Sequence, residues 1–105
     1  MSIISVNDAT LKEHILSTGV TIIDFGAVWC PPCKVLLPIL EDLNKTYGEQ
    51  IRILKVDVDE SPASTAQYGV QSIPTVFILR HGTPMEKFIG LRPKSAYSQV
   101  IQQFL

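Results

Sequence analysis

Three short, almost wholly apolar runs rich in Val, Ile and Phe divide the chain, at residues 20–25, 51–56 and 75–79. Runs of this length and composition are typical of β-strands that are buried on both faces of a sheet. Apolar residues recur with helical spacing before, between and after these runs. We therefore expect the order β, α, β, α, β, α, β, β, α, with helices near residues 11–16, 36–43, 63–68 and 95–104.

Polar residues and prolines mark where some of these helices begin. Asn7 or Asp8 can cap the first helix with a side-chain oxygen. Ser61 followed by Pro62 is typical of an N-cap residue with proline in the first turn. Each signal predicts a helix start within one or two residues.

The pattern near the C-terminus indicates the fold class. Residues 81–84, His-Gly-Thr-Pro, predict a hairpin turn that joins the strand at 75–79 to one at 86–89. Alternating strands and helices that finish in a hairpin and a helix predict an α/β fold, with a central mixed β-sheet flanked by helices on both faces. No linker or repeat interrupts the pattern, so we expect a single domain over residues 1–105.

The charge balance excludes several classes of partner. Nine Lys and Arg against ten Asp and Glu give a net charge of −1, with no basic cluster for a nucleic acid or an acidic membrane surface. The apolar runs are too short to span a membrane, and residues 1–10 lack the pattern of a signal peptide. We therefore expect a cytoplasmic protein.

The two cysteines, Cys30 and Cys33, lie where the strand at 20–25 has ended and the next helix begins. Ligands usually bind at such strand-to-helix junctions of open α/β sheets. Cys30 precedes Pro31 and suits the N-cap position, where the helix dipole and free amides lower the pKa of a thiol. The spacing also lets Cys33 attack a mixed disulfide formed at Cys30.

Other interpretations of the cysteine pair are weaker. A zinc site needs four ligands, and the remaining candidates, His14 and His81, lie far apart in the sequence. A structural disulfide that closes so short a loop removes little entropy from the unfolded chain. Redox chemistry is the interpretation that the spacing favours.

Further short motifs accompany the cysteine pair: Asp24-Phe25, Trp29-Cys30, Pro32-Cys33-Lys34, Pro38, Lys55, Asp57, Asp59, Ile73-Pro74-Thr75, Gly82 and Gly90. With these motifs the chain resembles the thioredoxin family along almost its whole length. The resemblance implies the thioredoxin fold and a protein thiol-disulfide oxidoreductase in which Cys30 attacks a substrate disulfide and Cys33 resolves the mixed disulfide. It further implies disulfide-containing protein substrates, a thioredoxin reductase as electron donor and no bound cofactor or metal.

Asp24 and Lys55 are charged residues inside apolar strands. A carboxylate in a buried strand has a raised pKa unless a charged partner reaches it. If the two strands are neighbours, Asp24 and Lys55 can pair beneath the cysteines. The resemblance implies that Asp24 exchanges protons with Cys33 during resolution.

The resemblance also predicts a cis peptide bond between Ile73 and Pro74. Such a bond would turn the Ile73 backbone outward beside Cys30, where an extended substrate segment could add as a strand. We expect a shallow apolar groove for substrates, lined by Trp29, Pro31, Pro32, Ile73 and Gly90.

Two residues depart from the family pattern. Pro31 stands where glycine is usual and removes an amide donor near the thiolate. Gly26 stands where an aromatic residue is usual, so a neighbour must fill the space or the loop gains mobility. Both can alter the redox potential, and two alternatives stay open: an oxidase or isomerase on the same fold, and a non-catalytic protein-binding module. A groove that accepts many proteins favours a monomer.

Overall fold

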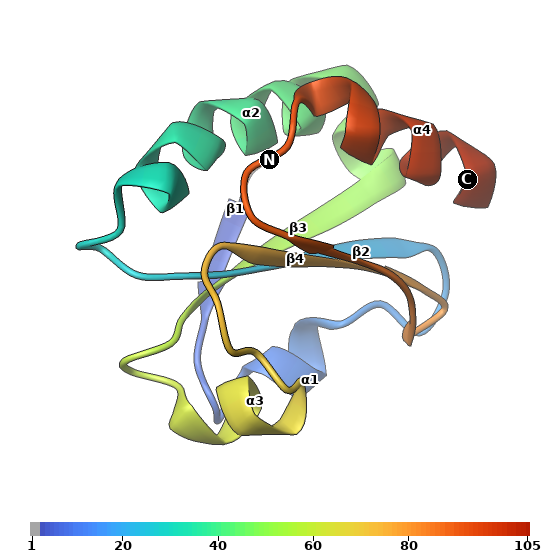
Figure 1. The fold of residues 1–105 in the computed structure, drawn as a ribbon. Coiled ribbons are helices and arrows are strands. Elements are labelled where there is room, and N and C mark those ends of the chain that lie inside the picture. The colour runs from blue at the N-terminus through green and yellow to red at the C-terminus, as the bar shows by residue number, and fades with distance from the viewer. Residues whose placement is uncertain (1–2) are drawn as a thin grey trace.

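A five-stranded sheet with helices on both faces makes up the fold of the computed structural model, which describes residues 3–105. Figure 1 shows α2 and α4 above the sheet and α1 and α3 below it. In chain order the elements are β1 (Ile3–Val6), α1 (Leu11–His14), β2 (Val20–Gly26), α2 (Pro31–Tyr47), the 3-10 turn η1 (Gly48–Gln50), β3 (Ile51–Asp57), α3 (Pro62–Gln67), β4 (Thr75–Arg80), β5 (Thr83–Ile89) and α4 (Lys94–Phe104).

The sheet is mixed and has β2 at its centre. The strand order is β1-β3-β2-β4-β5, with β1 and β2 parallel to β3, and with β4 antiparallel to both β2 and β5. Every residue of β2 is buried, and β4 is buried except at Arg80. The predicted element order and the predicted burial of these strands on both faces are therefore confirmed.

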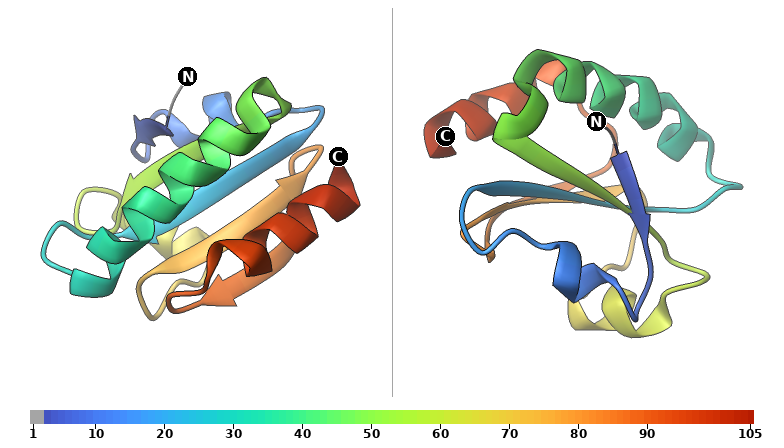
Figure 2. Two further views of the ribbon diagram at one scale, coloured as in Figure 1. Left: turned by 90° about the horizontal axis from the view of Figure 1, so that it is seen from above. Right: turned by 180° about the vertical axis from the view of Figure 1, so that it is seen from behind.

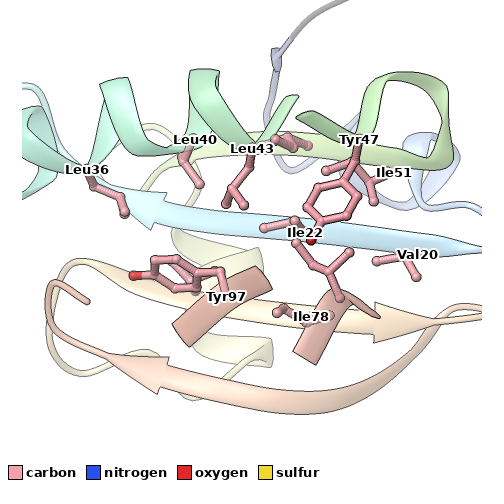
Figure 3. Packing of buried hydrophobic residues seen from close by; sticks show 12 residues of the cluster. Val20, Ile22, Leu36, Leu40, Leu43, Tyr47, Ile51, Ile78 and Tyr97 are labelled. Carbon is pink, nitrogen blue, oxygen red and sulfur yellow. The ribbon is translucent and has the colours of Figure 1, made fainter. Parts of the chain in front are cut away.

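Alternation along β2 divides the core into two layers. Val20 and Ile22 pack under α2 and α4, whereas Ile23 and Phe25 pack against the α1 and α3 side. Figure 2 shows α2 and α4 side by side across one face of the sheet. Figure 3 shows the layer beneath these helices, where Tyr97 of α4 lies among aliphatic side chains.

Helix α3 begins at Pro62 with Ser61 at its N-cap, as predicted, and α1 begins at Leu11, but the side chains that cap these helices differ from the prediction. The first helix is a single turn that ends at His14, and the Asp8 carboxylate caps α3 rather than α1. The backbone amides of Ala63 and Ser64 donate to Asp8 at 3.1 and 2.7 Å. Ser61 does occupy the N-cap position, but in the described part of the chain its side chain makes no capping bond.

The hairpin turn is shorter than predicted. It consists of His81 and Gly82, both with positive φ (52° and 82°), so β5 begins at Thr83. A two-residue hairpin turn needs a positive φ at both residues if its backbone twist is to match that of the two strands. His81 and Gly19 also exchange two hydrogen bonds, one between their backbones (2.8 Å) and one from the Gly19 amide to His81 Nδ1 (2.9 Å). His81 is therefore a structural residue of the turn.

Candidate functional site

Cys30 and Cys33 are joined by a disulfide bond at the junction between β2 and α2. Cys30 is the N-cap residue of α2, with extended backbone angles, and its sulfur accepts a hydrogen bond from the Cys33 amide at 3.3 Å. The prediction that Cys30 caps this helix is confirmed. Both cysteines are buried, with 4% of each residue exposed. One helical turn therefore holds the two sulfur atoms close enough to be oxidised to a disulfide and reduced again to two thiols.

The two prolines decide how many amides reach the Cys30 sulfur. Pro31 and Pro32 occupy the first helical positions and carry no N–H group. The first amide of α2 is therefore that of Cys33, and the Lys34 amide donates to the Cys30 carbonyl oxygen at 3.2 Å instead. In the first turn one backbone donor is left to stabilise a Cys30 thiolate.

Asp24 lies behind the cysteines and is 1% exposed. Burial raises its pKa to about 6, and the charge of Lys55 acts in the opposite direction. Within residues 3–105, Asp24 Oδ1 has no hydrogen-bond partner and no ion pair joins Asp24 to Lys55. The two residues are register partners on β2 and β3, as expected, and they interact through charge, but the expected pairing does not reach a salt bridge in the described residues. Lys55 instead opens to a cleft between β1 and α2 that Ser5 and Glu41 also line.

Gly26 separates the carboxyl group from the inner cysteine. A Cβ atom at position 26 would lie 3.2 Å from Cys33 Sγ and 3.9 Å from Asp24 Oδ1. Of the two outcomes expected for Gly26, the structure shows the first: a neighbour, Cys33, fills the space. The missing side chain lets the Cys33 sulfur sit against the β2 backbone on the side where Asp24 points.

Most of the residues predicted for the groove lie beside the cysteines, either as chain neighbours or by packing. Trp29 is 62% exposed, and its Nε1 donates to Asp59 Oδ2 at 2.7 Å, a contact that sequence reasoning missed. Ile73 packs against the cluster formed by Ala27, Cys30 and Cys33.

The remaining groove residues complete one side of the site. The Ile73–Pro74 peptide bond is cis, as predicted, and the Gly90 amide donates to the Pro74 carbonyl oxygen at 2.8 Å. Gly90 has a positive φ of 88°. Pro31 and Pro32 are exposed on the helix side of the cysteines, and Pro74 is buried. Of the predicted site residues, Lys55 alone faces a separate cleft.

A comparison with known families decides which chemistry this arrangement serves. The thioredoxin family model matches residues 2–103. The chain belongs to the thioredoxin family. Among curated thioredoxins, those of Staphylococcus saprophyticus and Staphylococcus haemolyticus are each 42% identical to it over 105 residues, which is all of both chains. A solved structure of a mutant thioredoxin from Halobacterium salinarum has a TM-score of 0.89 at 30% identity, covering 98% of this chain and 90% of that one.

Family membership and the cysteine pair together establish the activity. The chain is a thioredoxin-type disulfide reductase, and Cys30 and Cys33 form its redox-active disulfide. The predicted thioredoxin fold and the predicted oxidoreductase function are both confirmed. Residues 3–105 contain no helix long and apolar enough to cross a membrane. They also contain no group of three or more His, Cys, Asp or Glu side chains arranged to hold a metal ion.

Proposed function

We propose that Cys30 is the attacking thiol and Cys33 the resolving thiol of this thioredoxin. The Cys30 thiolate attacks one sulfur of a substrate disulfide, which forms a mixed disulfide and releases one substrate thiolate. The Cys33 thiolate then attacks Cys30 Sγ, which releases the second substrate thiolate and leaves the Cys30–Cys33 disulfide. Two electrons pass to the substrate.

The observation that carries this assignment is the different surroundings of the two sulfurs. Cys30 Sγ lies at the N-cap of α2 and accepts the Cys33 amide, an arrangement that favours the thiolate. Cys33 Sγ lies inward, against Gly26 and on the Asp24 side. Cys30 therefore reacts with the substrate disulfide first, and Cys33 reacts in the second step.

Asp24 supplies the base for that second step. Its pKa of about 6 leaves it mostly ionised at neutral pH and close to the working pH, the range in which a general base is effective. It takes the proton from the Cys33 thiol as Cys33 attacks, either directly or through water. Lys55 has a smaller role, because its charge keeps the Asp24 pKa from rising further.

The surface around Cys30 fits an extended protein segment. Trp29 and the two prolines present apolar area on one side of the cysteines, with Ile73 and Gly90 on the other. Such a shallow surface suits many protein disulfides rather than one small molecule. A reductase protein regenerates the dithiol, and the chain works as a single-domain monomer in the cytoplasm without a bound cofactor.

Single-cysteine variants test the order of attack. Each variant is mixed with a protein that contains an accessible disulfide, such as insulin, and mixed disulfides are resolved by mass spectrometry. Cys33→Ser should accumulate a stable adduct through Cys30, because nothing resolves it. Cys30→Ser should form adducts at least tenfold more slowly, and equal trapping by the two variants would contradict the assignment.

A further inference from the structure

Two buried oxygen atoms on the α2 and α4 side of the sheet make no hydrogen bond of ordinary geometry within the described residues. One is Asp24 Oδ1, and the other is the hydroxyl oxygen of Tyr97. Tyr97 lies on α4 and is 0% exposed. Buried polar groups in folded proteins are rarely left without a partner, because burying one unpaired destabilises the fold. The third such atom in the described residues, Ser61 Oγ, lies at the start of α3, so these two are the pair that shares one layer of the core.

Both side chains point into the same region. Asp24 follows Val20 and Ile22 at alternate positions of β2, so it faces the layer in which Tyr97 is buried. Figure 3 shows the Tyr97 hydroxyl pointing away from Val20 and Ile22, toward the end of the cluster where Leu36 lies. Leu36 is three residues beyond Cys33 on α2, so the hydroxyl is directed toward the end of the layer that holds the cysteines.

We propose that Tyr97 is a positioning residue for Asp24, whose hydroxyl donates through a bridging water to the Asp24 carboxylate and stabilises its ionised form beside Cys33. No direct hydrogen bond joins the two groups in the described residues, and one water between them would give both oxygens a partner. The electrostatics agree, since burial raises the pKa of the Tyr97 phenol and the Asp24 charge raises it further, which keeps the phenol a donor.

Few other groups lie near Asp24 on the elements packed against it. Lys55 is its register partner on β3 and acts on it through charge, although its side chain opens to the cleft between β1 and α2. Cys33 approaches it from α2, and its partner on β4 is the apolar Val76. Arg92, just before α4, acts on Tyr97 as well. Its backbone amide approaches the phenol oxygen as a donor, and both this amide and the Arg92 charge favour the phenolate, so the phenol O–H is the part of Tyr97 that remains to donate. Tyr97 is therefore the neutral donor that can act on the Asp24 carboxylate.

The test is the ionisation of Asp24 in Tyr97→Phe, followed by carbon NMR of the carboxyl group in the reduced protein. Phenylalanine keeps the ring and removes the hydroxyl. The midpoint of Asp24 should rise by about half to one pH unit, a threefold to tenfold change in its ionisation constant. An unchanged midpoint would leave Tyr97 a packing residue, and a lowered midpoint would mean that it accepts from the neutral acid. Either result would overturn the proposal.

Tyr47→Phe is the matched control. Tyr47 belongs to the same buried cluster, but its hydroxyl bonds with Ser98 and Gln102 of α4. Its removal should leave the Asp24 midpoint within about 0.2 pH units of the native value.

The NMR midpoint of Asp24 does not depend on activity, although the effect on turnover rests on the proposed role of Asp24. The pH profile of turnover should move with the midpoint in Tyr97→Phe, and Tyr97→Phe should add no shift when Asp24→Asn is already present.

Discussion

Asp24 and Lys55 are register partners on the adjacent strands β2 and β3, yet among the described residues no ion pair joins their side chains. Asp24 is thus buried without a direct countercharge, and desolvation outweighs the attraction of Lys55. A carboxyl group in this situation destabilises the fold when it is ionised. Its place behind the redox-active cysteines is one where a base is useful.

Asp24→Asn should stabilise the protein at neutral pH. The pKa of Asp24 is about 6 in the folded protein and 3.8 ordinarily, a difference worth about 3 kcal/mol. Because the folded value is the higher one, Asp24 costs stability increasingly as pH rises from about 4 to about 6, and by a constant amount above that range. Urea unfolding should therefore show a gain of about 2 to 3 kcal/mol at pH 7 and almost none at pH 3.5.

The same variant should reduce disulfides more slowly. Without the carboxylate, Cys33 loses its proton acceptor, and turnover at pH 7 should fall by about tenfold or more. Equal turnover of the two proteins between pH 6 and pH 8 would remove Asp24 from the mechanism, whatever its effect on stability.

Lys55→Met should raise the pKa of Asp24, because the Lys55 charge lowers it in the native protein. The acid limb of the turnover profile should move to higher pH by about half a unit. Lys12→Met provides the control, since Lys12 is exposed on α1, on the opposite face of the sheet. A shift of the same size in both variants would show that Lys55 acts through net charge alone.

Pro32→Ala should make the Cys30 thiol react at lower pH. The substitution restores an amide at the second helical position, where amides point at the side chain of the N-cap residue. We expect the midpoint of iodoacetamide alkylation to fall by about half to one pH unit. Pro31→Ala restores an amide at the first position, which does not point at the cap, and should change the midpoint far less. The reverse ranking would contradict the single-donor description of the Cys30 sulfur.

Asp8→Ala should lower the melting temperature by removing the carboxylate that caps α3. The Ser64 amide is the main cause of the lowered pKa of Asp8, so its contribution is present above about pH 4 and is lost as pH falls through the folded value. Calorimetry should show the deficit at pH 7 and its decline under strongly acidic conditions. Ser61→Ala should cause no such loss, although Ser61 holds the N-cap position. A larger deficit in Ser61→Ala would mean that the cap was assigned to the wrong side chain.

Much of the fold follows from local pattern, and the exceptions have identifiable causes. The burial of β2 and β4 on both faces was predictable from continuous apolar runs. The apolar spacing of Leu11, Ile15 and Leu16 suggested a longer first helix, but Ile15 adopts an extended backbone and the Leu16 amide donates to the Thr21 hydroxyl at 3.1 Å. That competing bond comes from Thr21 in β2, five residues further along the chain, and the apolar spacing of 11–16 does not reveal it.

In the site, too, some features follow from local sequence and others only from the folded structure. Cys30 as a cap and Cys33 as its neighbour follow from three-residue spacing and proline chemistry. The distance between Asp24 and Lys55 depends on side-chain conformation, which strand register alone does not determine. The proposed role of Tyr97 could not be predicted, because an aromatic residue on the apolar face of a helix is usually a core residue. Only the fold shows that its hydroxyl and the Asp24 carboxyl group lie in the same layer.

The reduction potential of the Cys30–Cys33 pair tests the central claim most directly. A dithiol–disulfide pair is strongly oxidising when the protein stabilises the reduced form, mainly its thiolate. In this protein Pro31 and Pro32 leave only one first-turn amide, that of Cys33, to stabilise the Cys30 thiolate. We therefore expect a potential of about −270 mV, measured by Trp29 fluorescence in glutathione or dithiothreitol buffers. A potential of about −120 mV would mean that the dithiol is strongly stabilised, and would contradict a reductase that delivers electrons to protein disulfides.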